Sequence, residues 1–233
     1  MAKPLCIVAG AGPGNGAAIG QKFAESGYAV ALLARDEGKL QKLTNRITGA
    51  SAYGCDLTDP DSVAATFSRI KQDLGPTSVL IYNAGGGHWG NIERTGPDEL
   101  EQAWRVNAYG CLLSVHQVLP EMLTAGTGSI VVIGATASLR GGANFTAFAS
   151  AKGAQRLLTQ SMARYLGPKG IHVSYVIIDG VVDLPRTRQR LPDKPDDYFL
   201  KPADIAESVL RLTQQKKSAW SFEIDLRPFG ESW

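Results

Sequence analysis

The sequence predicts an α/β protein with one doubly wound, mostly parallel sheet that carries helices on both faces. Three observations predict this fold class. Short apolar runs alternate with amphipathic stretches along the whole chain of 233 residues. The apolar runs are nearly continuous in Val, Ile and Leu, which is typical of strands buried on both faces of a parallel sheet. A glycine-rich segment separates the first run from the first amphipathic stretch.

The expected elements alternate in order. We expect strands at residues 5–10, 28–34, 78–82, 129–134, 172–178 and 220–226, and helices at residues 17–26, 39–48, 61–74, 97–123, 143–166 and 202–214. Alternation of this kind predicts strand–helix–strand units in a single doubly wound sheet. Residues 1–233 are therefore expected to form one domain.

One segment, residues 183–200, is rich in Pro, Asp and Arg and is expected to be irregular. In an open α/β sheet, a long loop after a late strand lies at the carboxyl edge, where ligands bind. We therefore predict that residues 183–200 form a substrate lid. The alternative is a surface excursion without a role in binding.

Composition and charge exclude several classes of protein. Hydrophobic residues make up 44% of the chain, enough for a substantial core and too many for a disordered chain. The net charge of +2, without a basic run, predicts no nucleic-acid partner. No apolar stretch approaches the roughly 18 residues of a membrane span, and the first residues lack the long apolar segment of a secretory signal. Cys6, Cys55 and Cys111 are not at metal-ligand spacing, so we expect buried thiols, a cytoplasmic location and no metal site.

The glycine-rich segment GAGPGNGAAIG, residues 10–20, lies between the first strand and the first helix. Glycines at this position allow a tight turn and let the backbone approach a pyrophosphate, whose charge is met by the helix N-terminus. We therefore expect a Rossmann-type dinucleotide site instead of a purely structural turn. The cradle is predicted to comprise Gly10, Gly12, Pro13, Gly14, Asn15 and Gly16.

The residues after the second strand are expected to face the adenosine ribose. Arg35 follows this strand directly, and its permanently charged planar guanidinium suits a 2′-phosphate. We therefore expect NADP(H) as the preferred cofactor, with NAD(H) possible. Asp36 is the competing candidate for a ribose hydroxyl, and in a further alternative Arg35 is only a solvated surface charge.

Taken together, the motifs resemble the short-chain dehydrogenase/reductase family over nearly the full length of the chain. They are GAGPGNG (10–16), CDLTD (55–59), YNAG (82–85), VNAYG (106–110), AFASAKGA (147–154) and IIDG (177–180). The resemblance implies that Asp56 and Leu57 hold the adenine ring, and that Asn83, Ala84 and Gly85 brace the central strand against the cofactor. It also implies that Asn107 keeps a helix open and ties a water to the active-site lysine, and it adds Gly180 and Val182 to the cofactor contacts.

The chain departs from this family at the residues that move a proton. Lys152 matches the lysine of the family's Tyr-x-x-x-Lys motif, but Phe148 occupies the position of the tyrosine and Ala135 that of the serine. A phenylalanine ring has no proton to donate, and a positioned general acid is worth about 10² to 10⁴ in rate. We therefore expect ordinary ketone reduction to be crippled. Lys152 can still hold the nicotinamide ribose.

Further departures lie nearby. The hydroxyls of Thr136 and Ser138 are one and three residues out of register with the family's serine. Asp179 replaces a proline, and Leu184 replaces a threonine that contacts the nicotinamide amide. The resemblance therefore implies an altered hydride-transfer end and an intact adenosine end.

Three side chains are candidates for a replacement acid. His88 follows YNAGGG and is expected near the nicotinamide end, where it either donates a proton or only shapes the pocket wall beside Trp89. Asp179 and Asp183 are the other candidates, with turn and capping roles as their alternatives.

Three functions remain open on the sequence. The favoured one is an NADP(H)-dependent oxidoreductase with an atypical active site, acting on an unknown small carbonyl, enone, iminium or alcohol. The second is a catalytically silent NADP(H)-binding sensor or regulatory subunit, and the third is a lyase or isomerase on the same scaffold. The resemblance also implies a homodimer or homotetramer that pairs through the helices at 97–123 and 143–166.

Overall fold

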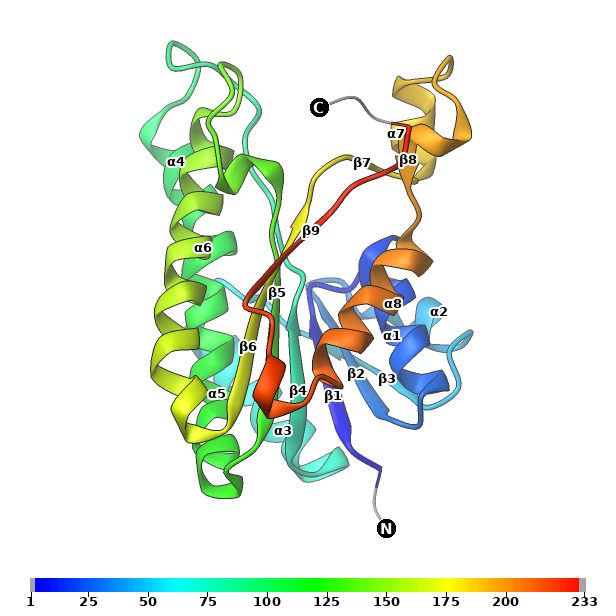
Figure 1. Cartoon of the computed structure of the whole chain (residues 1–233), viewed down its shortest axis with the longest axis vertical. Coiled ribbons are helices and arrows are strands. Elements are labelled where there is room, and N and C mark those ends of the chain that lie inside the picture. Colours follow the sequence, from blue (N-terminus) through cyan, green and yellow to red (C-terminus); the bar gives the residue numbers. More distant parts are fainter. Residues whose placement is uncertain (1–2, 231–233) are drawn as a thin grey trace.

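Seven parallel strands in the order β3-β2-β1-β4-β5-β6-β9 form the central sheet in a computed structural model that describes residues 3–230 (Figure 1). The strands are β1 (Leu5–Ala9), β2 (Ala29–Ala34), β3 (Ala50–Gly54), β4 (Thr77–Tyr82), β5 (Gly128–Ile133), β6 (Ile171–Ile178) and β9 (Glu223–Leu226). A second small sheet pairs β7 (Val181–Val182) with β8 (Phe199–Leu200). The predicted fold class, a doubly wound parallel sheet, is confirmed.

Helices cover both faces of the sheet, as Figure 1 shows. One layer contains α1 (Asn15–Glu25), α2 (Glu37–Thr44) and α8 (Pro202–Thr213), and the other contains α3 (Pro60–Leu74), α4 (Pro97–Trp104), α5 (Gly110–Ala125) and α6 (Thr146–Leu166). An apolar core lies between each layer of helices and the sheet. Phe23 belongs to the core under α1 and α8, and Phe67 belongs to the core under α3 and α5. Within residues 3–230, no helix combines the length and apolar character needed to cross a bilayer.

The direction of winding reverses between β1 and β4, which lie side by side in the middle of the sheet. In doubly wound sheets this reversal opens a crevice at the carboxyl ends of the strands, where ligands bind. The glycine-rich segment begins at Gly10, immediately after β1. The sheet therefore brings the predicted cofactor cradle to the site where this class of fold binds ligands.

The sequence did not predict strand β3. Its segment, ASAYG, contains small residues, and only Tyr53 is fully buried, because β3 is the edge strand and pairs on one side only. It therefore lacks the continuous branched apolar run that identified the inner strands.

The helix expected at 97–123 is not uniform, because a π-helical turn at Arg105–Tyr109 separates α4 from α5. Side chains from other elements bond to the carbonyl groups of this turn. The Tyr82 hydroxyl donates to the Val106 carbonyl at 2.6 Å, and Gln155 Nε2 donates to the Asn107 carbonyl at 2.9 Å. These partners stabilise the wider turn, which spacing in the sequence alone does not show.

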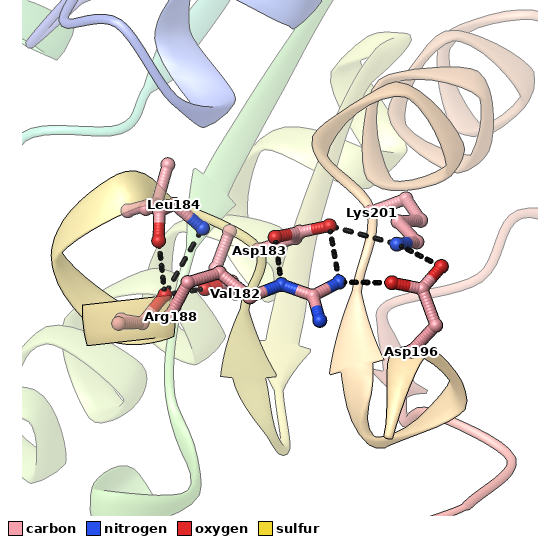
Figure 2. Close-up of polar contacts among 7 residues, drawn as sticks. Val182, Asp183, Leu184, Arg188, Asp196 and Lys201 are labelled. Atoms are coloured by element: carbon pink, nitrogen blue, oxygen red, sulfur yellow. Dashed lines mark hydrogen bonds and ion pairs between the residues drawn. The ribbon is translucent and has the colours of Figure 1, made fainter. Parts of the chain in front are cut away.

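The expectation that 183–200 is irregular is wrong. The segment contains α7 (Pro185–Arg190), a 3₁₀ turn and β8, and β8 pairs with β7. The Asp183 carboxylate accepts from Arg188 Nε and from Lys201 Nζ, each at 2.7 Å, and both cations also bind Asp196. Figure 2 shows this network, in which Asp183 precedes α7 and Lys201 follows β8. The segment lacks apolar periodicity in its sequence. Ion pairs between residues that are separated along the segment hold it in shape instead.

Candidate functional site

The glycine-rich turn is tied to the end of β4. Gly10 has a φ of +92°, and a Cβ on it would lie 2.3 Å from the backbone nitrogen of Ala84, so only glycine fits here. The side-chain amide of Asn83 donates to the Gly10 carbonyl at 2.7 Å, and the Ala84 backbone donates to Ala9 at 2.9 Å. Asn83 and Ala84 therefore tie the end of β4 to the glycine-rich turn and to the end of β1.

Helix α1 begins with free backbone donors at the cradle. Gly14 is its N-cap, no side chain caps the helix, and no acidic residue lies in the first turn. A Cβ on Gly12 would meet nothing within 4 Å, whereas a Cβ on Gly16 would lie 2.7 Å from the Ala11 Cα. The turn is thus tightly packed on one side and open at Gly12, with uncapped N–H groups that favour an anion. These features fit a pyrophosphate, and Pro13 lies exposed on the same turn.

Asn15, the first residue of α1, carries a second sign of a ligand site. Its Oδ1 atom is buried without a hydrogen-bond partner among residues 3–230. Buried polar atoms are almost always paired in folded proteins. An unpaired amide oxygen at the mouth of an anion-binding turn is consistent with a bound polar group that completes it.

At the end of β2 the two candidates for the ribose, Arg35 and Asp36, have different contacts. Asp36 caps α2, since its Oδ1 accepts from the Lys39 backbone at 3.0 Å, and its other oxygen pairs with Lys39 Nζ at 2.9 Å. These contacts with Lys39 lower the pKa of Asp36. Arg35 is exposed, and its charge contributes to the lowered pKa of Asp56. The carboxylate is therefore committed to a helix cap, and Arg35 lies beside Asp56.

Asp56 and Leu57 follow β3 at the same edge of the sheet. Asp56 Oδ1 accepts from the backbone and the hydroxyl of Thr58 at 2.9 and 2.8 Å, which lowers the pKa of Asp56. Leu57 is buried in the core on the α3 side. The two residues thus shape the wall next to Arg35, where the resemblance expects adenine.

Lys152 is buried, with 4% of its surface exposed. Its Nζ donates to the Ile133 carbonyl at 3.0 Å and to Gln155 Oε1 at 2.9 Å. Burial lowers the pKa of Lys152 to about 8. An ammonium has three N–H groups, and within residues 3–230 two acceptors, the Ile133 carbonyl and Gln155 Oε1, bond to it.

Asn107 faces the same space as Lys152. Its Nδ2 donates to the Gly86 and Ala103 carbonyls at 2.6 and 2.8 Å, whereas its Oδ1 is buried without a partner in the described chain. Asn107 Oδ1 and Lys152 Nζ each lie 3.4 Å from the position that a Cβ of Gly85 would take. Gly85 therefore leaves room beside both atoms. The Asn107 carbonyl accepts from the Gln155 side-chain amide at 2.9 Å.

Phe148, one turn before Lys152 on α6, packs against the loop after β4. A Cβ on Gly87 would lie 2.7 Å from Phe148 Cδ2, and the Trp89 ring lies 5.0 Å from the Phe148 ring between centroids. Trp89 is 62% exposed and also contacts Phe145 edge to face. The wall beside Lys152 is therefore aromatic. Ala135 follows β5 with an extended backbone, and its carbonyl accepts from the Ser138 hydroxyl at 2.7 Å.

Two of the candidate acids, Asp179 and Asp183, form ion pairs within the protein. The Thr136 hydroxyl donates to the Asp179 carboxylate, which also pairs with Arg227. The two cations in Figure 2 hold the pKa of Asp183 well below its usual range. The His88 ring lies over the loop backbone, with Nε2 2.9 Å from where Gly90 would carry a Cβ. The carboxylates of Asp179 and Asp183 are thus held by cations within the protein.

The segment after β6 lies over the glycine-rich turn. Leu184 Cδ2 is 2.7 Å from the position of a Cβ on Gly14, so this leucine rests on the start of α1. Gly180 and Val182 precede it, and the Val182 carbonyl accepts from the Thr187 hydroxyl at 2.6 Å (Figure 2). The segment thus covers the cradle from the side on which the resemblance places the nicotinamide.

Sequence reasoning missed Gln155 and Tyr175, which lie under Lys152. Gln155 is fully buried in the middle of α6, three residues after Lys152 and on the same helix face. A polar side chain on an inward face was the signal that could have identified it. Tyr175 is buried in β6, and its hydroxyl lies 3.5 Å from Gln155 Oε1.

Comparisons of sequence and structure with known proteins show the family and the fold. The family model "short chain dehydrogenase" matches residues 4–195. The crystal structure of a short-chain dehydrogenase from Rhodopseudomonas palustris superposes with a TM-score of 0.84 at 36% identity, over 97% of this chain and 99% of that one. A metagenomic short-chain oxidoreductase in complex with NADP gives a TM-score of 0.85 at 28% identity, over 99% of each chain. A protein of Xanthobacter autotrophicus named inactive 2-(S)-hydroxypropyl-CoM dehydrogenase 2 is 32% identical, over 82% of this chain and 89% of that protein.

Proposed function

This chain belongs to the short-chain dehydrogenase family, and we propose that it is an NADP(H)-dependent oxidoreductase with an atypical active site. Its substrate is a small molecule with an electron-poor C=C or C=N⁺ bond, such as an enone or an iminium. One observation carries this proposal: Phe148, a hydrocarbon ring packed on Gly87 and Trp89, occupies the helix position one turn before Lys152 where the resemblance expects a proton donor.

The preference for NADP(H) is supported at the end of β2. Asp36 is used as a helix cap, and Arg35 is left exposed beside Asp56. A guanidinium attracts the 2′-phosphate, whereas a free carboxylate would repel it. The relative solved with NADP has the same fold over 99% of this chain. NAD(H) remains the weaker alternative.

The choice of bond follows from the proton balance. A bound nicotinamide would supply hydride. Reduction of a ketone also needs a proton on oxygen, and a positioned acid contributes about 10² to 10⁴ in rate. An iminium becomes a neutral amine on accepting hydride alone, and an enone gives an enolate that takes its proton from water. Neither substrate needs an O–H group at Phe148.

The chain's own residues would bind and orient these groups. Lys152 would offer its third N–H to the nicotinamide ribose, and Leu184 would close over the glycine-rich turn at Gly14. Trp89 and Phe148 would form an apolar wall beside the reacting carbon. Residues 183–200 would act as the lid, held in shape by the ion pairs of Asp183.

Restoring the missing hydroxyls tests this proposal. The double substitution Ala135→Ser with Phe148→Tyr should create NADPH-dependent reduction of simple ketones at least tenfold above the parent chain. Ala135→Ser with Phe145→Tyr is the matched control, since it adds the same two groups with the phenol at the neighbouring ring. If the first double variant reduces ketones no faster than the control, the missing hydroxyl groups do not account for the slow ketone reduction, and the proposal fails.

A silent NADP(H)-binding subunit is the second candidate. It is favoured by the engagement of Thr136, Asp179 and Asp183 in internal pairs, and by the relative whose name includes "inactive". Tight NADPH binding without turnover on any enone or iminium would favour this candidate over the first.

The chain is further proposed to form a homodimer or homotetramer in the cytoplasm. Support comes from large apolar side chains exposed on α4 and α6, namely Trp104, Leu157 and Tyr165. These side chains lie on two helices that pack against each other, and apolar surface that partners cover is typical of interfaces. The buried free thiols of Cys6, Cys55 and Cys111 support a reducing compartment.

A further inference from the structure

A buried amide links the two polar residues that face the cofactor site. Gln155 Oε1 accepts from Lys152 Nζ at 2.9 Å, and Gln155 Nε2 donates to the Asn107 carbonyl at 2.9 Å. Gln155 is completely buried, so both bonds form out of contact with water. The amide thus connects α6 to the π-helical turn and holds the lysine amino group in position.

The surroundings of Gln155 are built to hold it in place. The Tyr175 ring lies under Gly134, where a Cβ would approach Tyr175 Cε1 to 2.3 Å. The absence of a side chain on Gly134 therefore leaves room for this ring. The Tyr175 hydroxyl then lies 3.5 Å from Gln155 Oε1 and 3.5 Å from the Lys152 carbonyl.

The number of donors on the lysine decides what this arrangement does. In its charged form Lys152 has three N–H groups, and the Ile133 carbonyl and Gln155 Oε1 use two of them. The third is directed by elimination to the remaining open side, beside Gly85. A neutral amine has only two N–H groups, which the same two oxygens would occupy, and would leave no donor for a ligand.

We propose that Gln155 is a positioning residue of the cofactor site, which holds the charged amino group of Lys152 so that a single N–H faces the nicotinamide ribose. This inference rests on the proposed NADP(H) site and adds to it a residue that touches neither cofactor nor substrate. The amide acts on the cofactor site through Lys152, and its bond to the Asn107 carbonyl holds the amide in place.

Few other groups compete for the charge at this position. Cys111 on α5 interacts with Lys152, and burial raises the pKa of this thiol to about 12. Burial likewise raises the pKa of Tyr175 on β6 to about 12. Asn107 on the π-helical turn and the Ile133 carbonyl on β5 do not ionise. Both acids are neutral where Lys152 titrates, and burial is the largest cause of the lowered pKa of Lys152.

The experiment is a ¹⁵N NMR titration of the lysine amino groups in the full chain without cofactor. The Lys152 signal is identified by its loss in Lys152→Met, and the wild-type midpoint is expected near pH 8. Gln155→Leu removes an acceptor from the ammonium and should lower the midpoint by about one pH unit. Gln155→Glu places a carboxylate there and should raise it by at least one unit.

The opposite directions of these shifts separate positioning from mere packing, and Gln160→Leu on the same helix is the matched control. The inference is overturned if both Gln155 variants keep the wild-type midpoint, or if both move it the same way. If Gln155→Leu fails to fold, Gln155→Glu alone decides, since a rise supports the inference and an unchanged midpoint refutes it. Because this titration contains no NADPH, failure of NADPH to bind would count against the proposed function only.

Discussion

The side-chain amide of Asn83, at the end of β4, donates to the carbonyl oxygen of Gly10, at the end of β1, over 2.7 Å. The two residues lie at the point where the winding of the sheet reverses. This bond fixes the first peptide of the glycine-rich turn, whose φ of +92° at Gly10 turns the chain toward α1. The shape of the cradle is therefore set by a residue far away in the sequence.

Asn83→Ala should weaken NADPH binding about tenfold, because it leaves the Gly10 carbonyl without its partner, and such a loss costs about 1–3 kcal/mol. The dissociation constant measured by NADPH fluorescence checks this expectation. Asn144→Ala, at an exposed loop position, is the control and should bind like wild type. Equal binding by the two variants would show that the brace does not shape the cradle.

Arg35→Ala should reduce the preference for NADPH over NADH at least tenfold, since it removes the cation beside the proposed 2′-phosphate. Affinity for NADH should change little. Arg46→Ala removes an exposed arginine just beyond the other end of α2 and should leave both affinities unaltered. If Arg35→Ala lost affinity for NADPH and NADH equally, the arginine would attract both nucleotides by its charge and would not select NADPH.

Gly134→Ala should lower the free energy of unfolding by about 1–3 kcal/mol, the usual penalty for overpacking a core. Its Cβ would come within 2.3 Å of the buried Tyr175 ring. Gly153→Ala on α6 meets nothing within 4 Å and should be neutral or stabilising, because alanine favours a helix over glycine. Urea unfolding of both variants measures the contrast. Similar stabilities would mean that the Tyr175 ring can move away from residue 134 and is not held in a fixed position.

Leu157→Lys should convert the proposed dimer or tetramer into monomers, since this leucine is 63% exposed in the middle of α6. Light scattering after size-exclusion chromatography gives the mass directly. Leu139→Lys is the control, because Leu139 is also exposed but lies outside the long helices. An unchanged mass for Leu157→Lys would place the interface on another face.

The sequence predicted what local pattern determines. The inner strands, the glycine-rich turn and the position of Lys152 could all be read from it, because each depends on neighbours within a few residues. Strand β3 was missed because an edge strand needs no continuous apolar run. The order in 183–200 was missed because Asp183, Arg188 and Lys201 meet only after the chain folds back.

The site shows the same division. Spacing along α6 placed Phe148 one turn from Lys152, and the two lie on the same helix as predicted. Asp36 accepts from the Lys39 backbone, and the Thr136 hydroxyl donates to Asp179. These hydrogen bonds depend on side-chain directions, which sequence spacing does not show. Gln155 was missed for a related reason, since its partners Lys152 and Asn107 belong to different elements.

Reduction of two matched pairs of compounds by the unaltered chain tests the central claim most directly. The pairs are 2-cyclohexenone with cyclohexanone, and the 2-methyl-3,4-dihydroisoquinolinium ion with 2-tetralone, each followed by NADPH absorbance and product analysis. Hydride transfer without a hydroxyl acid predicts turnover of the enone at its C=C bond or of the iminium, at least 100-fold faster than of the matched ketone. Ketones reduced as fast as their partners would contradict the account, because a proton donor would then have to act beside Phe148.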